Sequence, residues 1–140
     1  MSIRVLFACA DPQTLELQQS VLASSLNLVC FAVTFASVTT VDDLWRRVDA
    51  GEDDVILLDW HLTGAETPQL VRSLLAHSPR LRIVALLPQG YRQYRHSVWE
   101  AGACSSIPTE NMDQEWLSSI LCVMQRSMQR EASLLQSTAN

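Results

Sequence analysis

Lysine is absent from this sequence, and glycine is scarce. All ten basic residues are arginine, and only four of the 140 residues are glycine. The chain therefore has no Gly-rich phosphate-binding loop, and it has no Gly-x-Ser-x-Gly turn of the kind that carries a hydrolase nucleophile. These absences disfavour nucleotide-binding and hydrolase functions.

Long apolar runs are also missing. No stretch approaches the roughly 20 consecutive apolar residues that span a bilayer, and the first residues lack the charged segment and apolar core of a secretory signal. We therefore expect a cytoplasmic domain that does not enter a membrane.

Cysteine and histidine do not cluster in the sequence. No Cys-x-x-Cys pair occurs, so we predict four buried, reduced thiols rather than a zinc site or disulfides; the cysteines are Cys9, Cys30, Cys104 and Cys122. No histidine has a cysteine or carboxylate at ligand spacing, so surface or loop positions are favoured over a metal site; the histidines are His61, His77 and His96.

The composition bounds the class of protein. The formal net charge is −5, which disfavours direct binding of nucleic acid because phosphate contacts need clustered cations. With 48% hydrophobic and 18% charged residues, the chain is typical of a globular protein with one core. We assign residues 1–136 to a single domain and residues 137–140 to a frayed tail or the start of a linker.

Apolar runs and helix signals alternate along the chain. The runs that favour strands are residues 3–9, 28–35, 55–59, 83–87 and 104–107. The segments with helical spacing are residues 12–26, 41–50, 67–78, 91–101 and, from Asn111 or Met112, onward to about 135. This alternation predicts a parallel sheet with helices on both faces.

Cap residues support two of these helices. Asp11 followed by Pro12 is a favourable helix start, and we interpret Asp11 as an N-cap. Thr40 with Asp43 resembles a capping box, and Gly51 closes the helix that follows.

The most informative stretch is residues 55–64. Four apolar residues lead directly to Asp59, after which the chain turns at Gly64. Such a run is typical of a strand buried on both faces, and the carboxyl end of a strand is where open α/β sheets place their ligands. Asp59 is therefore the leading candidate for a functional residue.

The order of the elements and three short motifs resemble the receiver domains of two-component response regulators. Leu-Leu-Asp-Trp-His-Leu-Thr-Gly at 57–64 is similar to the receivers' Leu-Leu-Asp-x-x-Met-Pro-Gly, and Ala-Gly-Ala at 101–103 precedes the fifth strand as in receivers. Residues 6–12 are placed like the receivers' first strand and acidic turn. The resemblance covers nearly the whole chain. It implies a flavodoxin/CheY-like fold, a doubly wound five-stranded parallel sheet, (βα)5, with a long C-terminal helix.

The resemblance assigns a role to Asp59 but leaves the rest of the site incomplete. In receivers the aspartate that ends the third strand accepts a phosphoryl group from a histidine kinase, and Asp59 holds that position. The two Mg²⁺-binding carboxylates correspond to Cys9 and Ala10, with Asp11 next to them. The receivers' hydroxyl residue, aromatic switch and lysine correspond to Leu87, Ser106 and Thr109.

These substitutions decide between two hypotheses. Phosphoryl transfer depends on charge stabilisation, and one electrostatic donor is worth about 2.7–4 kcal/mol in such sites. We therefore favour a degenerate receiver, a pseudo-receiver that makes little use of Asp59 and needs no metal or other cofactor. The alternative is a conventional Mg²⁺-dependent receiver that is phosphorylated on Asp59.

Aromatic and methionine residues mark a candidate interaction face. They are Tyr91, Tyr94, Trp99, Trp116, Met124 and Met128. The resemblance implies a homodimer through the fourth helix, fifth strand and fifth helix; alternatively, Trp99 and Trp116 are core anchors. At roughly 24 residues, or about 36 Å, the last helix is longer than the sheet needs and suits a partner helix or a connector to an output domain.

We therefore expect a signalling domain rather than an enzyme. It would act through dimerisation or through control of a partner such as a transcriptional output domain. A small α/β enzyme or a flavin carrier is a distant alternative, since the turn at residues 10–13 lacks the hydroxyl and glycine residues that cradle a flavin phosphate.

Overall fold

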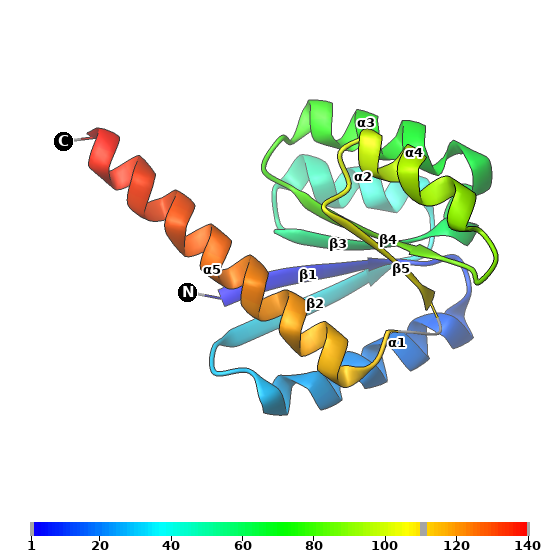
Figure 1. Ribbon diagram of the computed structural model, residues 1–140, viewed down its shortest axis with the longest axis horizontal. Coiled ribbons are helices and arrows are strands. Elements are labelled where there is room, and N and C mark those ends of the chain that lie inside the picture. The colour runs from blue at the N-terminus through cyan, green and yellow to red at the C-terminus, as the bar shows by residue number, and fades with distance from the viewer. Residues whose placement is uncertain (1, 110–111, 140) are drawn as a thin grey trace.

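A computed structural model describes residues 2–109 and 112–139 (Figure 1). Five strands form one parallel sheet in the order β2-β1-β3-β4-β5. They are β1 (Ser2–Ala8), β2 (Ala32–Val38), β3 (Val55–Asp59), β4 (Arg82–Leu87) and β5 (Ser105–Pro108). The doubly wound sheet predicted from the sequence is confirmed.

Helices connect the strands and cover both faces of the sheet. They are α1 (Pro12–Ser25), α2 (Val41–Ala50), α3 (Thr67–His77), α4 (Arg95–Glu100) and α5 (Gln114–Ala139). Short 3-10 turns lie at η1 (Leu26–Leu28), η2 (Trp60–Leu62), η3 (Gly64–Glu66) and η4 (Arg92–Tyr94). Figure 1 shows α2, α3 and α4 on one face and α1 and α5 on the other.

The central strand β3 contributes to both halves of the core. All five of its residues are buried, and successive side chains alternate between the faces. Ile56 and Leu58 pack in the cluster under α2, α3 and α4, whereas Val55 and Leu57 pack in the cluster under α1 and α5. This two-sided burial explains the unbroken apolar run and fixes Asp59 at the strand's end.

The predicted caps are present. The Asp11 carboxylate accepts hydrogen bonds from the backbone N–H groups of Gln13 and Thr14, at 3.3 and 3.2 Å. The Thr40 hydroxyl accepts the N–H of Asp43 at 3.2 Å, and Gly51 ends α2 in the left-handed conformation with a φ of 66°. The interpretation of Asp11 as an N-cap is confirmed.

Two predicted boundaries are wrong. The sequence predicts the second strand at 28–35, but β2 spans Ala32–Val38. The strand starts later because the chain first forms η1, where Leu28 is 54% exposed. The helix placed at 91–101 is shorter, since η4 occupies its first turn and α4 covers Arg95–Glu100.

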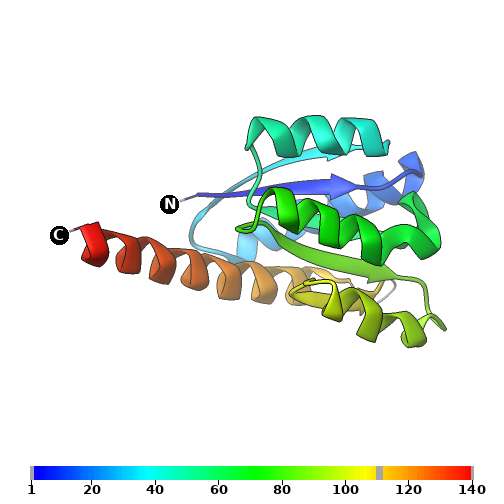
Figure 2. The same cartoon turned by 90° about the horizontal axis from the view of Figure 1, so that it is seen from above.

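The last helix also differs in its ends. It starts at Gln114, where the Asp113 carboxylate accepts the backbone N–H of Trp116 at 2.8 Å, so the predicted start at Met112 is wrong. The other predicted start, Asn111, lies outside the described residues. The helix continues to Ala139, and Figure 2 shows it running well beyond the sheet. No helix of the described chain is apolar enough over sufficient length to cross a membrane.

The prediction of four buried thiols is wrong for two of them. Cys9 is buried and Cys122 is partly buried, but Cys30 and Cys104 are exposed. Cys30 follows η1 in a surface loop, and Cys104 lies at the start of the edge strand, so apolar neighbours in sequence did not imply burial. All four are free cysteines.

The histidines lie at the surface, as expected. Two of them face carboxylates: His77 lies 2.8 Å from Asp49, and His96 lies 2.8 Å from Glu100. Within the residues that the structure describes, no group of three potential metal-binding side chains is present.

Candidate functional site

Asp59 lies at the carboxyl end of β3, between β1 and β4, and is only 3% exposed. Its carboxylate accepts a weak hydrogen bond from the Cys9 thiol, with 3.7 Å between Sγ and Oδ2. None of the ion pairs within residues 2–109 and 112–139 includes Asp59. The candidate acceptor is thus a buried carboxylate without a cationic partner.

Burial controls the protonation of Asp59. Loss of solvation raises the pKa of this carboxyl above its ordinary value, and the positive charge that His61 can carry acts against the rise without cancelling it. The carboxylate form is therefore disfavoured by the fold.

Cys9 stands where the resemblance places a metal-binding acid. Its thiol lies 3.7 Å from the Asp59 carboxylate and 3.6 Å from the Asp11 backbone carbonyl. Burial raises the pKa of the Cys9 thiol to about 11, and the charge of Asp59 acts in the same direction. At neutral pH the thiol keeps its proton and is a neutral donor.

The other two positions of the acidic turn add no ligand to the pocket. Ala10 is exposed and has no polar side chain. The Asp11 carboxylate is also exposed and is bound by the first turn of α1, where hydrogen bonds led by the Thr14 hydroxyl lower its pKa. Its negative charge stabilises the N-terminus of α1 and is not directed at a metal site.

The three switch positions likewise leave Asp59 without a cation. The Leu87 side chain is 2% exposed and packs in the core under α4. The Thr109 hydroxyl donates to the Leu87 backbone carbonyl at 3.4 Å, and the Ser106 hydroxyl accepts from Arg95 Nε at 3.3 Å. These contacts are internal to the β4, α4 and β5 region.

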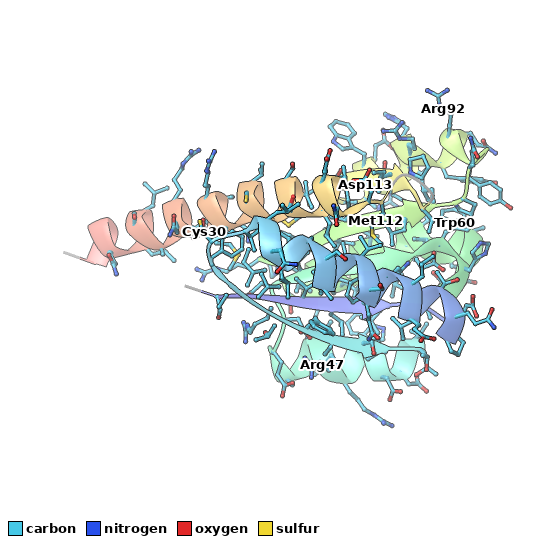
Figure 3. All side chains as sticks on the ribbon, turned by 90° about the horizontal axis from the view of Figure 1, so that it is seen from below. Cys30, Arg47, Trp60, Arg92, Met112 and Asp113 are labelled. Carbon is cyan, nitrogen blue, oxygen red and sulfur yellow. The ribbon has the colours of Figure 1, made fainter. Side chains whose placement is uncertain are left out.

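Trp60 is a part of the site that sequence reasoning missed. It is 4% exposed, and Figure 3 labels its side chain. The Trp60 ring lies 4.7 Å from that of Tyr94 and 6.0 Å from that of Tyr91. The two tyrosine rings are 5.8 Å apart. This aromatic cluster joins the residue after Asp59 to the segment before α4. The sequence signal for it is a tryptophan directly after the position of the phosphoryl acceptor.

Two of the aromatic residues assigned to the candidate interaction face lie at the surface. Trp99 is 65% exposed and Tyr91 is 39% exposed, so Trp99 is not a core anchor. Trp116 is partly buried against the core under α5.

The methionines and Tyr94 are more enclosed. Met124 is 4% exposed and packs between α5 and the sheet, so its assignment to the interaction face is wrong. Met128 is partly buried against the same cluster, and Tyr94 is partly buried against the opposite one. The helical spacing of the methionines reflects core packing.

Solved structures of response regulators share the fold of this chain. A CheY-like receiver domain protein from Methanospirillum hungatei JF-1 matches 94% of this chain and 99% of its own length, with a TM-score of 0.73 at 14% identity. The chain has the receiver fold. A two-component response regulator from Clostridium difficile matches 90% of this chain and 98% of its own, with a TM-score of 0.74 at 13% identity.

A longer regulator contains the same fold as one part. DrrB of Thermotoga maritima, described as an OmpR/PhoB homologue, matches 94% of this chain but 54% of its own, with a TM-score of 0.68 at 18% identity. No family model matches the sequence, and no curated protein is significantly similar to it.

Proposed function

We propose that this chain is a degenerate receiver that signals through protein contacts without normal phosphorylation of Asp59. The observation that carries the proposal is the environment of Asp59, which is 3% exposed and faces a protonated thiol instead of metal-binding acids and a lysine. The receiver fold supports a signalling domain rather than an enzyme.

The residues present do not fit Mg²⁺. This ion is small and hard, and it is bound by carboxylates and water in octahedral geometry. At the receiver's two acidic positions the chain offers the Cys9 thiol and the Ala10 methyl group. The Asp11 carboxylate accepts hydrogen bonds from the N-terminus of α1 instead. Of the four positions Cys9, Ala10, Asp11 and Asp59, only Asp59 presents a buried carboxylate.

The phosphoryl group would find little stabilisation either. Receivers use a lysine and a hydroxyl donor, and here Leu87 supplies a buried alkyl group while Thr109 bonds to the Leu87 carbonyl. Because several electrostatic contributions are lost together, slow transfer is expected even after allowance for non-additivity.

Incubation with acetyl phosphate and Mg²⁺, followed by intact-mass measurement, tests the proposal. The wild-type chain should gain no phosphoryl group. A variant that combines Cys9→Asp, Ala10→Asp, Leu87→Thr and Thr109→Lys restores the missing chemistry and should gain one, provided that circular dichroism shows it folded. Addition of Asp59→Asn to that variant should abolish the gain. Phosphorylation of the wild-type chain at Asp59 would instead establish the conventional receiver.

The interaction we propose is a homodimer through α4, β5 and α5. Trp99 presents 65% of its surface to solvent on this face, and large exposed aromatic residues are enriched at interfaces. Sedimentation velocity should show concentration-dependent association that Trp99→Ala weakens. Leu17→Ala is the matched control, since Leu17 is 68% exposed on α1 at another face. A monomer at the highest attainable concentration would refute the dimer.

Helix α5 is the proposed connector to an output domain or partner. It runs beyond the sheet as a continuous helix to Ala139, and DrrB shows that the same fold forms one part of a longer regulator. Control of transcription through such a domain is part of the proposal, and the full reading frame of the gene would test it.

A further inference from the structure

A hollow of about 500 Å³ lies between the segment after β4, the edge strand β5 and the start of α5. Its apolar walls include Pro88, Ile107 and Pro108. A neighbouring hollow of about 540 Å³ is lined by residues of α4 and β5, and the two share Arg92, Arg95 and Ser106. The first hollow has the size of many small-molecule sites, about 300–1,000 Å³.

Two arginines that line this hollow have no ion-pair partner among the described residues. In an acidic chain, Arg4, Arg47 and Arg82 are all paired with carboxylates. Neither Arg92 nor Arg95 takes part in an ion pair within the described residues. Two like charges three residues apart repel each other in a helical segment, so a bound anion would relieve the repulsion.

The arginine side chains are placed differently. Arg95 donates through Nε to the Ser106 hydroxyl at 3.3 Å, which orients its guanidinium beside β5. Its remaining N–H groups have no hydrogen-bond partner within the described residues. Arg92 projects outward at the rim from η4 (Figure 3). A guanidinium fork matches phosphate or carboxylate oxygens, so this pair can grip an anion that enters from solvent.

Two aromatic rings complete the hollow. Trp116 lines it from the first turn of α5, where the Asp113 carboxylate accepts the backbone N–H of Trp116 at 2.8 Å, and the Trp116 side chain is partly buried against the core under α5. Tyr91 lines it from the other side, and its ring packs against those of Trp60 and Tyr94. Aromatic rings beside guanidinium groups provide a surface on which a flat ligand can stack.

We propose that this hollow binds a small organic anion that carries an aromatic ring. Arg92 and Arg95 would bind the anionic group, and Trp116 and Tyr91 would contact the ring. Recognition would use arginine rather than a Gly-rich loop, which the sequence lacks. Asp59 does not line the hollow, so the proposal stands whether or not Asp59 accepts phosphate, although two of the switch positions, Leu87 and Ser106, do line it.

Titration calorimetry at low ionic strength tests this inference with four probes. Adenosine monophosphate supplies a ring with a phosphate, and indole-3-acetate supplies a ring with a carboxylate. Adenosine and inorganic phosphate each lack one half of the ligand. At least one ringed anion should bind saturably and ten-fold or more tightly than adenosine and phosphate.

Variants locate the binding. Arg95→Ala should weaken binding of that probe at least ten-fold, and Trp116→Leu should weaken it while phosphate binding stays unchanged. Arg72→Ala is the matched control, because Arg72 is an exposed arginine of α3 that lines neither hollow. Circular dichroism should show all three variants folded. No saturable binding of either ringed anion, or binding that Arg95→Ala leaves unchanged, would overturn the inference.

Discussion

Replacement of Asp59 by asparagine should stabilise the fold. The carboxylate is 3% exposed, it has no ion-pair partner within the described residues, and the hydrogen bond that it accepts is a thiol contact of 3.7 Å. An asparagine keeps the shape and an acceptor oxygen but removes the buried charge. A buried polar group with inadequate partners costs about 1–3 kcal/mol. Asp59→Asn should therefore raise the free energy of unfolding at pH 7 by about 1–3 kcal/mol and Tm by roughly 3–10 °C.

The pH dependence gives this prediction its sign. Burial raises the pKa of Asp59 above the ordinary 3.8, so the folded chain binds more protons than the unfolded chain in the window from about that value upward. Stability from this group is then lost as the pH rises through the window. The gain from Asp59→Asn should be full at neutral pH and should vanish below the ordinary value, where both states hold the proton.

Urea denaturation followed by circular dichroism at pH 7 and at acidic pH measures both effects. Asp11→Asn is the control, because hydrogen bonds from the first turn of α1 lower the pKa of Asp11. Its carboxylate contributes stability above its ordinary pKa, which is lost as the pH falls, so Asp11→Asn should not stabilise at pH 7. If Asp59→Asn left the protein unchanged or less stable at neutral pH, Asp59 would have a compensating partner, and the reasoning would fail.

Other predictions follow from the core and the thiols. Trp60→Ala should lower the free energy of unfolding by about 3–5 kcal/mol, measured by urea denaturation, because it empties the aromatic cluster; a cost below that of a surface substitution would contradict the buried ring. Gln18 of α1 is 2% exposed, and neither its Nε2 nor its Oε1 has a partner within the described residues. Gln18→Met should therefore stabilise by about 1–3 kcal/mol in the same assay, and a loss would reveal a hidden partner. With its pKa raised to about 11 and its side chain buried, Cys9 should resist iodoacetamide in the native state at mildly alkaline pH, whereas the exposed Cys30 should be alkylated. Peptide mass mapping measures the two reactivities, and alkylation of Cys9 before Cys30 would contradict the prediction.

The fold could be predicted from the sequence because its central strands are buried on both faces. The run before Asp59 has apolar residues at every position, and two-sided burial is what such a run requires. The edge strand β2 was misplaced for the opposite reason. Most of its residues are exposed or partly buried, and Phe35 is 45% exposed, so apolar content did not mark its ends.

The functional site was predictable only for residues whose role depends on their place at the end of a strand or the start of a helix. Asp59 and the N-cap Asp11 follow from their places in the chain. The packing of Trp60 against Tyr91 and Tyr94 depends on a loop from a different βα unit, which no local pattern encodes. Met124 was placed at the surface because methionines at helical spacing suit a core face and an interface equally well.

The central claim is that Asp59 has lost the chemistry of phosphoryl transfer while the receiver fold remains. Fluorine NMR of the chain mixed with Mg²⁺ and beryllofluoride, a mimic of the phosphoryl group, tests this most directly. The account predicts no resonances of protein-bound fluoride for the wild-type chain. Bound resonances that disappear in Asp59→Asn would contradict it.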